Sequence, residues 1–308
     1  MPVNRHLSLA GMCLLAVACL SADAPATPQA DPAPVFDAAR AWKHLEALVA
    51  IGPRPAGSPG AERTRAYIRE QLAALGLKTA DQAFDADTPA GRIRMVNLTA
   101  TIPAAGSASG RLLFASHYDT KRFDDITFVG ANDGGSSTAF LVELARVLKA
   151  RRNALTIELV FFDGEEAIGD WSSGNTWGSR HYVDAARKAG TLGDLKAMIL
   201  VDMIGDRNLT IKRDTNSTPW LLDIIWSAAR RLNRPEFVSD TTTIDDDHLP
   251  FVRAGVPAVD IIDLDYPDET MAYWHTAEDT LDKLSPKSLQ VVADVLLAAL
   301  PGIEARVK

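Results

Sequence analysis

Apolar residues recur at helical spacing in two segments close to the start of the patterned part of the chain. In residues 36–52 they fall three positions apart, at Phe36, Ala39, Trp42, Leu45 and Leu48. Residues 60–76 repeat this pattern and stop at a glycine. Spacing of this kind is typical of amphipathic helices, so two helices are predicted to open the folded region.

Further along the chain, short apolar runs alternate with helical patterns. The predicted strands are 95–102, 111–119, 155–163, 197–205 and 256–263, and the predicted helices are 138–150, 178–190, 218–233 and 288–307. No repeat of fixed period interrupts this order. Alternating strands and helices favour an α/β fold: a three-layer α/β/α sandwich with a mixed, largely parallel central sheet. We expect residues 36–308 to form it as one domain.

The first 35 residues follow a different pattern. Residues 1–24 combine Arg5 with an apolar run that is short for a membrane span, which predicts a signal peptide and export of the chain. Residues around Cys19 resemble the lipid-attachment box of bacterial lipoproteins, so cleavage before Cys19 and cleavage near Ala24 both stay open. Residues 25–35 are a Pro/Ala-rich linker. The predicted location is the periplasm, or the cell envelope through a lipid at Cys19, which would be the only membrane contact.

Composition narrows the classes of partner. The net charge is -8 and the basic residues form no concentrated face, so a nucleic-acid partner is disfavoured. Both cysteines, Cys13 and Cys19, lie in the predicted signal, so residues 36–308 have no disulfide and must be stabilised by their core and by a metal. The acidic composition, poor in patches, is compatible with a monomer.

Acids and histidines follow the predicted strands. They lie after the strands, at the start of the next helix and past the final strand, as His117, Glu165, Glu166, Asp202, Asp133 and His275. In open α/β sheets the carboxyl ends of the strands meet at one edge, where ligands bind. Oxygen and imidazole donors without thiolates suit a catalytic zinc, which keeps one position open for substrate.

Two neighbouring carboxylates would repel each other in an apolar setting unless something compensates them. In extended backbone, successive side chains point in opposite directions. Glu166 can therefore bind a metal while Glu165 stays free beside it, and the cation offsets the repulsion. A free, partly desolvated carboxyl next to a metal is suited to proton transfer.

Each signal also has an ordinary structural explanation. An acid after a strand is usually part of a turn, an aspartate before glycines commonly caps a helix, and tryptophans are often buried in the core. His181 is expected to cap or pack. The functional interpretation depends on all the polar residues falling at one edge of the same predicted sheet.

Several motifs together resemble a known superfamily over about residues 36–305. They are "HYD", "GANDGGSS", "FFDGEEA", "GSRHYV", "LVDMIG" and "WHT". The set is similar to the zinc-dependent aminopeptidases and, in its finer pattern, to the animal-type glutaminyl-peptide cyclotransferases. That family converts N-terminal glutamine of peptides and proteins to pyroglutamate and releases ammonia.

The resemblance implies a metal site position by position. Asp133, Glu166 and His275 match the zinc ligands of the cyclotransferases. His117 and Asp202 match the positions that bind a second zinc in the aminopeptidases, bridged through Asp133. One zinc ion is expected, and the ligand set leaves room for two.

The resemblance also assigns the proton chemistry and the pocket. Glu165 matches the proton-shuttling acid, and Asp202 and Asp246 match acids that hydrogen-bond with it. Trp171 and Trp274 match the aromatic walls of the substrate pocket, which would keep water out and favour attack by the substrate's own amine.

Two departures from the family pattern keep an alternative in view. Asp245 stands where the animal enzymes have an uncharged polar residue, and the loop before His275 is longer, so Tyr266 is matched to the pocket's phenylalanine across a changed loop. The alternative is an exported zinc aminopeptidase with one or two ions. A catalytically silent binding module is disfavoured because Glu165 is present.

Overall fold

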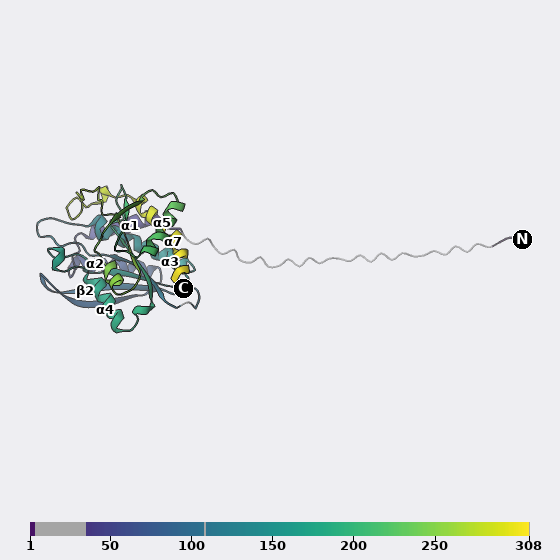
Figure 1. Ribbon diagram of the computed structural model, residues 1–308, viewed down its shortest axis with the longest axis horizontal. Coiled ribbons are helices and arrows are strands. Elements are labelled where there is room, and N and C mark those ends of the chain that lie inside the picture. The colour runs from purple at the N-terminus through teal and green to yellow at the C-terminus, as the bar shows by residue number, and fades with distance from the viewer. Residues whose placement is uncertain (4–34, 108, 308) are drawn as a thin grey trace. The chain divides into compact units, whose positions relative to one another are not determined.

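Six strands pair into one sheet in the order β1-β2-β4-β3-β5-β8. Their bounds are β1 Thr79–Thr88, β2 Gly91–Ile102, β3 Arg111–His117, β4 Thr156–Phe162, β5 Leu195–Asp202 and β8 Ala258–Ile262. The β3–β4, β3–β5 and β5–β8 pairings are parallel, whereas β1–β2 and β2–β4 are antiparallel. The prediction of a mixed, largely parallel sheet is confirmed (Figure 1).

The structure is a computed structural model that describes residues 1–3, 35–107 and 109–307. Residues Ala33–Lys308 form one compact unit, distinct from Met1–Pro32. The predicted signal peptide and linker, with Cys19, lie almost wholly outside the described residues and stay predictions.

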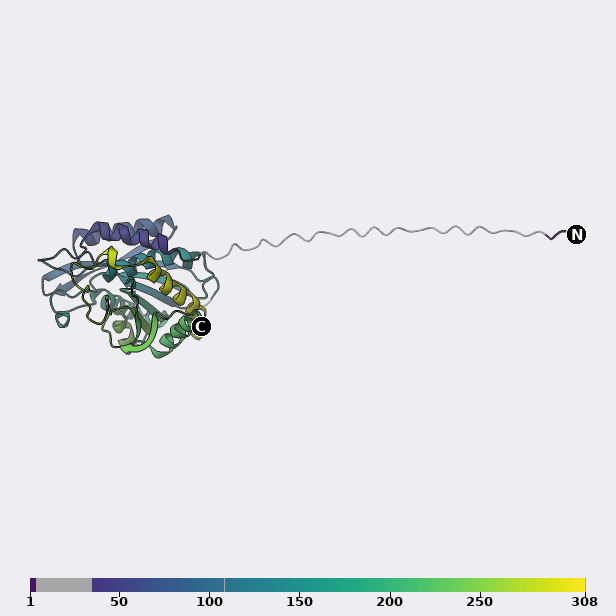
Figure 2. The same cartoon turned by 90° about the horizontal axis from the view of Figure 1, so that it is seen from above.

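Seven α-helices are present in the described part of the chain. Their bounds are α1 Ala38–Ile51, α2 Pro59–Ala74, α3 Ser137–Ala150, α4 Trp177–Lys188, α5 Pro219–Arg231, α6 His248–Arg253 and α7 Pro286–Val307. The largest apolar cluster joins one face of the sheet to α1, α2, α3, α5 and α7, and a second cluster joins the other face to α4 and α6. Helices therefore cover both faces, as the predicted three-layer sandwich requires (Figure 2).

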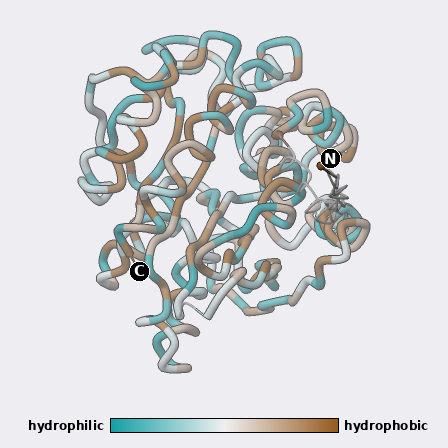
Figure 3. The backbone as a smooth tube through the Cα atoms, turned by 90° about the vertical axis from the view of Figure 1, so that its right-hand side faces the viewer, coloured by the Kyte–Doolittle hydropathy of each residue, from teal (hydrophilic) through white to brown (hydrophobic). Residues whose placement is uncertain are grey.

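Strand β3 illustrates why the inner strands read as continuous apolar runs. Leu112 and Phe114 belong to the cluster on one face, and Leu113 and Ala115 to the cluster on the other. Successive side chains of a strand alternate in direction, so a strand covered on both sides must be apolar at every position. Hydrophobic segments accordingly run through the interior in Figure 3.

Helix α7 is long and apolar enough, by length and composition, to cross a membrane. Most of its apolar window is nevertheless buried, and its apolar residues pack in the same cluster as those of α1 and α5. It is the helix predicted for residues 288–307, and it lies in the core.

Some short or polar elements escaped prediction. Strand β1 is an edge strand with most residues at least partly exposed, so it carries no apolar run. Its hairpin partner β2 begins at Gly91, four residues earlier than predicted, because the ladder continues to the Thr88–Gly91 pair. A small parallel pair, β6 (Ile211–Asp214) and β7 (Phe237–Thr242), also lacked a clear signal.

Candidate active site

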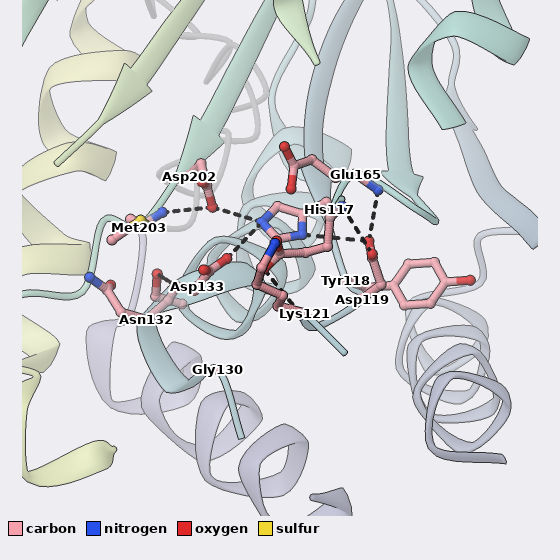
Figure 4. A network of polar contacts seen from close by, with 12 residues as sticks. His117, Tyr118, Asp119, Lys121, Gly130, Asn132, Asp133, Glu165, Asp202 and Met203 are labelled. Atoms are coloured by element: carbon pink, nitrogen blue, oxygen red, sulfur yellow. Dashed lines mark hydrogen bonds and ion pairs between the residues drawn. The ribbon is translucent and has the colours of Figure 1, made fainter. Parts of the chain in front are cut away.

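Three parallel strands deliver the first functional side chains to one edge of the sheet. His117 is the last residue of β3 and Asp202 the last of β5, while the chain leaving β4 reaches Glu165 and Glu166 within four residues. Because β3, β4 and β5 are mutually parallel, these ends coincide, and Figure 4 shows His117, Glu165 and Asp202 gathered there. The predicted convergence is present in the structure.

Asp133 reaches this edge from the irregular turn that precedes α3. Its backbone is not helical (φ -74°, ψ 108°), and it is followed by Gly134 with φ +69°. A β-carbon on Gly134 would lie 2.7 Å from the carbonyl oxygen of Asp119. Glycine is therefore needed at this position both for its backbone angle and for the close approach of another chain segment.

Asp133 lies between two groups of metal-type donors. Its Oδ1 is 3.3 Å from His117 Nε2, which is 3.1 Å from Asp202 Oδ1. Its Oδ2 is 3.2 Å from His275 Nε2, which is 3.3 Å from Glu166 Oε2. Each triplet, His117/Asp133/Asp202 and Asp133/Glu166/His275, has its donor atoms within 4.8 Å of one another.

The chemistry of these donors fits a bound zinc ion. Asp133 Oδ2 and Glu166 Oε2 are buried and have no hydrogen-bond partner. Buried carboxylate oxygens without partners are costly, and a divalent cation would satisfy both of them. Neutral imidazole and carboxylate oxygen are ligands that zinc accepts in catalytic sites.

The raised pKa values of His275 and His117 also indicate a site that attracts positive charge. Burial opposes the protonation of His275, but Glu166 and Asp133 outweigh it and raise the pKa of His275 to about 9. Burial also disfavours the charged form of His117, yet Asp202 and its other acidic neighbours raise the pKa well above the usual range. Surrounding acids that demand positive charge at both imidazoles would equally attract a metal cation.

Glu165 belongs to neither triplet and lies beside them. It is 6% exposed, and burial followed by the charge of Asp246 raises the pKa of its carboxyl well above the ordinary value. Burial and the charge of Asp202 raise the pKa of Asp246 to about 7. The charge of Asp246 therefore acts on Glu165 and that of Asp202 on Asp246, and the hydrogen bonds expected among these three acids stay a prediction.

Asp119 orients the glutamate pair, a role that the sequence motif did not reveal. Its Oδ1 accepts a hydrogen bond from the Glu165 amide at 3.2 Å, and its Oδ2 accepts one from the Glu166 amide at 3.3 Å. The available signal was its position two residues after His117. Lys121 was also missed: its amide donates to Glu166 Oε1 and its Nζ to the carbonyl of Ala167.

A cavity of about 400 Å³ opens over the site. Trp171 and Trp274 line it together with Glu165, and the Trp274 ring stacks on His275 with 4.0 Å between centroids. Neither tryptophan is fully buried. Both tryptophans therefore line the cavity, and Trp274 also packs against an apolar cluster, while their role as walls for the substrate stays a prediction.

The placement of Tyr266 contradicts the prediction that it contacts substrate. Its side chain is completely buried and does not line the cavity. The hydroxyl donates a 2.9 Å hydrogen bond to Asp279 Oδ1. The aromatic ring is therefore packed in the interior, and Tyr266 contacts the site only through Asp279, which accepts a hydrogen bond from the Asp133 amide.

Comparisons with known proteins agree with this geometry. The model of peptidase family M28 matches residues 97–300. The glutaminyl-peptide cyclotransferase of Boiga irregularis is 30% identical, with 83% of this chain and 79% of the relative covered. The chain is a member of peptidase family M28 and, within it, of the glutaminyl-peptide cyclotransferases.

Solved structures place the chain beside other glutaminyl-peptide cyclotransferases. The glutaminyl cyclase of an Acidobacteriales bacterium is 40% identical, covers 92% of this chain and 100% of its own, and superposes with a TM-score of 0.83. A Zn-dependent exopeptidase from Parabacteroides distasonis, 24% identical over 87% of this chain and 99% of its own, shares the fold with a TM-score of 0.79. The family resemblance predicted from the motifs is confirmed.

Proposed function

We propose that this chain is a zinc-dependent glutaminyl-peptide cyclotransferase that converts the N-terminal glutamine of peptides or proteins to pyroglutamate and releases ammonia. The observation that carries the proposal is the Asp133/Glu166/His275 triplet with uncoordinated, buried Glu165 beside it, at the floor of a cavity lined by two tryptophans. The relatives named above support the same activity.

One zinc ion is proposed, held by Asp133, Glu166 and His275. When bound, it would polarise the carbonyl of the substrate's side-chain amide. With a single ion, His117 would keep its 3.1 Å contact with Asp202 as a hydrogen bond or ion pair. The His117/Asp133/Asp202 triplet is the place for a second ion if one binds.

Glu165 would carry the proton through the reaction. It accepts a proton from the α-amine as that nitrogen bonds to the side-chain amide carbon, and it returns the proton to the departing ammonia as the C–N bond breaks. A raised pKa makes the carboxylate a stronger base for the first step, and the carboxylic acid formed in this way is the donor in the second. Asp202 and Asp246 would set the charge next to it.

The cavity walls would hold the substrate in a ring-like pose. Trp171 and Trp274 offer flat apolar surfaces for the side-chain methylenes of glutamine. Intramolecular attack gains greatly from such orientation, and excluding water protects it from competing hydrolysis. An aminopeptidase, in contrast, has to admit water to the metal.

A paired assay tests the proposal against the aminopeptidase alternative, which the second donor triplet keeps in view. We expect the purified full chain to release ammonia from a glutaminyl peptide and to release no leucine from leucinamide. N-acetylated glutaminyl peptide is the matched control and should not react, because its amine is blocked. Free leucine from leucinamide, which is released there together with ammonia, combined with no ammonia from the glutaminyl peptide, would establish a peptidase instead.

Trp171 gives a further expected result. Trp171→Ala should lower kcat/KM for the glutaminyl peptide by about tenfold or more, because a wall that positions the substrate and excludes water is lost. Trp171→Phe should recover part of it. Trp220→Phe is the control: Trp220 lies on α5 under Arg306, away from the cavity, and its replacement should leave kcat/KM unchanged. If Trp171→Ala and the original chain had the same kcat/KM, the proposed role of Trp171 in holding the substrate would be wrong.

We also propose that the chain acts outside the cytoplasm as a monomer, either released by cleavage near Ala24 or held at the membrane only by a lipid on Cys19. The apolar run and small residues of positions 1–24 support export.

A further inference from the structure

A buried carboxylate stands directly behind the Asp133 turn. Asp279 is 1% exposed, and its Oδ1 and Oδ2 accept hydrogen bonds from the backbone amides of Asn132 and Asp133 at 2.8 and 3.1 Å. Its own carbonyl oxygen accepts a third amide, that of Ala131, at 3.3 Å. Tyr266 completes the set by donating its hydroxyl to Oδ1 at 2.9 Å.

A buried arginine holds the opposite side of the same turn. Arg54 is 0% exposed, and its guanidinium donates to the carbonyl oxygens of Val129 at 2.5 Å, Gly130 at 2.7 Å and Asp133 at 3.3 Å. It also donates to the carbonyl of Tyr118 at 2.7 Å. These contacts join the start of α3 to the chain that leaves β3 at His117.

The two contacts are complementary. Asp279 accepts hydrogen bonds from the amides of the turn, whereas Arg54 donates hydrogen bonds to its carbonyls. The peptide groups that flank Asp133 are therefore fixed from both sides. The turn needs this support because Asp133 and Gly134 depart from helical angles. Asp279 also lies four residues after His275, in a segment tied by a 3.2 Å bond from the Asp279 amide to the Thr276 carbonyl.

We propose that Asp279 and Arg54 are positioning residues that preset the Asp133/Glu166/His275 site for its metal. Asp279 links two of the three ligands, Asp133 by hydrogen bonds and His275 along the chain. It fixes their relative position before the ion arrives. Outer-sphere partners of this kind typically change metal affinity by about 10–100-fold when they are removed. The proposal rests on the metal site proposed above.

The test is the zinc affinity of full-length variants, measured by competition with a chromogenic chelator. Asp279→Ala should weaken zinc binding about 10–100-fold, and Tyr266→Phe, which removes one of the hydrogen bonds to Asp279, should weaken it less. Asp279→Asn keeps the size of the side chain but replaces one acceptor by a donor, so we expect an intermediate loss. Arg54→Lys keeps the positive charge but loses the planar guanidinium that donates to several carbonyls at once, so it should also weaken zinc binding.

The matched control is Asp282→Asn. Asp282 lies three residues further on, is largely exposed and contacts Thr280 and Lys283, so its replacement should leave zinc affinity unchanged. A role in stability alone would lower the melting temperature of the metal-free and zinc-loaded protein equally. A positioning role predicts that zinc raises the melting temperature of Asp279→Asn less than that of the original chain.

The outcomes separate this inference from the proposed function. If the original chain binds no zinc, the metal site itself is wrong. If the original chain binds zinc and Asp279→Ala and Asp279→Asn bind it equally well, the site stands and the positioning role of Asp279 is overturned.

Discussion

Glu165→Gln leaves the zinc content of the protein unchanged and lowers kcat for ring closure by about 10²–10⁴-fold, the usual contribution of a general acid–base group. The zinc content is retained because Glu165 belongs to neither donor triplet. The rate falls because an amide cannot accept the proton of the α-amine at neutral pH. The measurement is steady-state ammonia release together with metal analysis of the same preparation.

Two comparisons make this result specific. Glu278→Gln changes an exposed glutamate that pairs with Lys283, and it should alter neither zinc content nor rate. Glu166→Gln changes the neighbouring residue and should lower zinc binding, since Glu166 Oε2 is a donor of the triplet. Near-complete activity of Glu165→Gln would show that another group moves the proton.

Loss of His275 should remove both the metal and the activity. His275→Ala deletes the only nitrogen donor of the Asp133/Glu166/His275 triplet and leaves two buried carboxylates facing each other. Zinc at a hundredfold excess over its Kd stabilises the folded state by about 2.7 kcal/mol. For a domain of this size that energy corresponds to roughly 5–10 °C in Tm, a gain that the variant should lack.

Parallel substitutions of the other histidines identify the number of ions. His117→Ala should keep one equivalent of zinc if a single ion binds at the His275 triplet, and should lose one of two equivalents if both triplets are filled. His181→Ala is the control, because His181 stacks on Phe84 with 4.2 Å between ring centroids, on the hairpin side of the molecule. Full zinc content in His275→Ala would contradict the proposed ligand set.

The sequence predicted what local periodicity and strand ends encode. Residues 36–52 became α1 and residues 111–119 became β3, because the burial of one helix face and of both strand faces is written in the spacing of apolar residues. The donors His117 and Asp202 were found because strand ends in parallel sheets share an edge. Edge strand β1 was missed because its residues are mostly solvated and need not be apolar.

Other parts of the site depend on contacts that spacing does not record. Arg54 meets Gly130 across 76 positions and Asp279 meets Asp133 across 146, so neither could be linked to the metal turn from sequence. The prediction that Tyr266 contacts substrate was wrong because matching a single residue to the family pattern gives its position in the loop and not the direction of its side chain. The buried ring shows that direction, toward Asp279 and away from the cavity.

The donors Asp133, Glu166 and His275 come from well-separated parts of the chain, each following a different strand of the sheet. An unfolded polypeptide consequently holds them far apart and offers no chelating pocket of its own. A metal ion can then bind only after tertiary assembly, so the ions available where the chain folds determine which one it acquires.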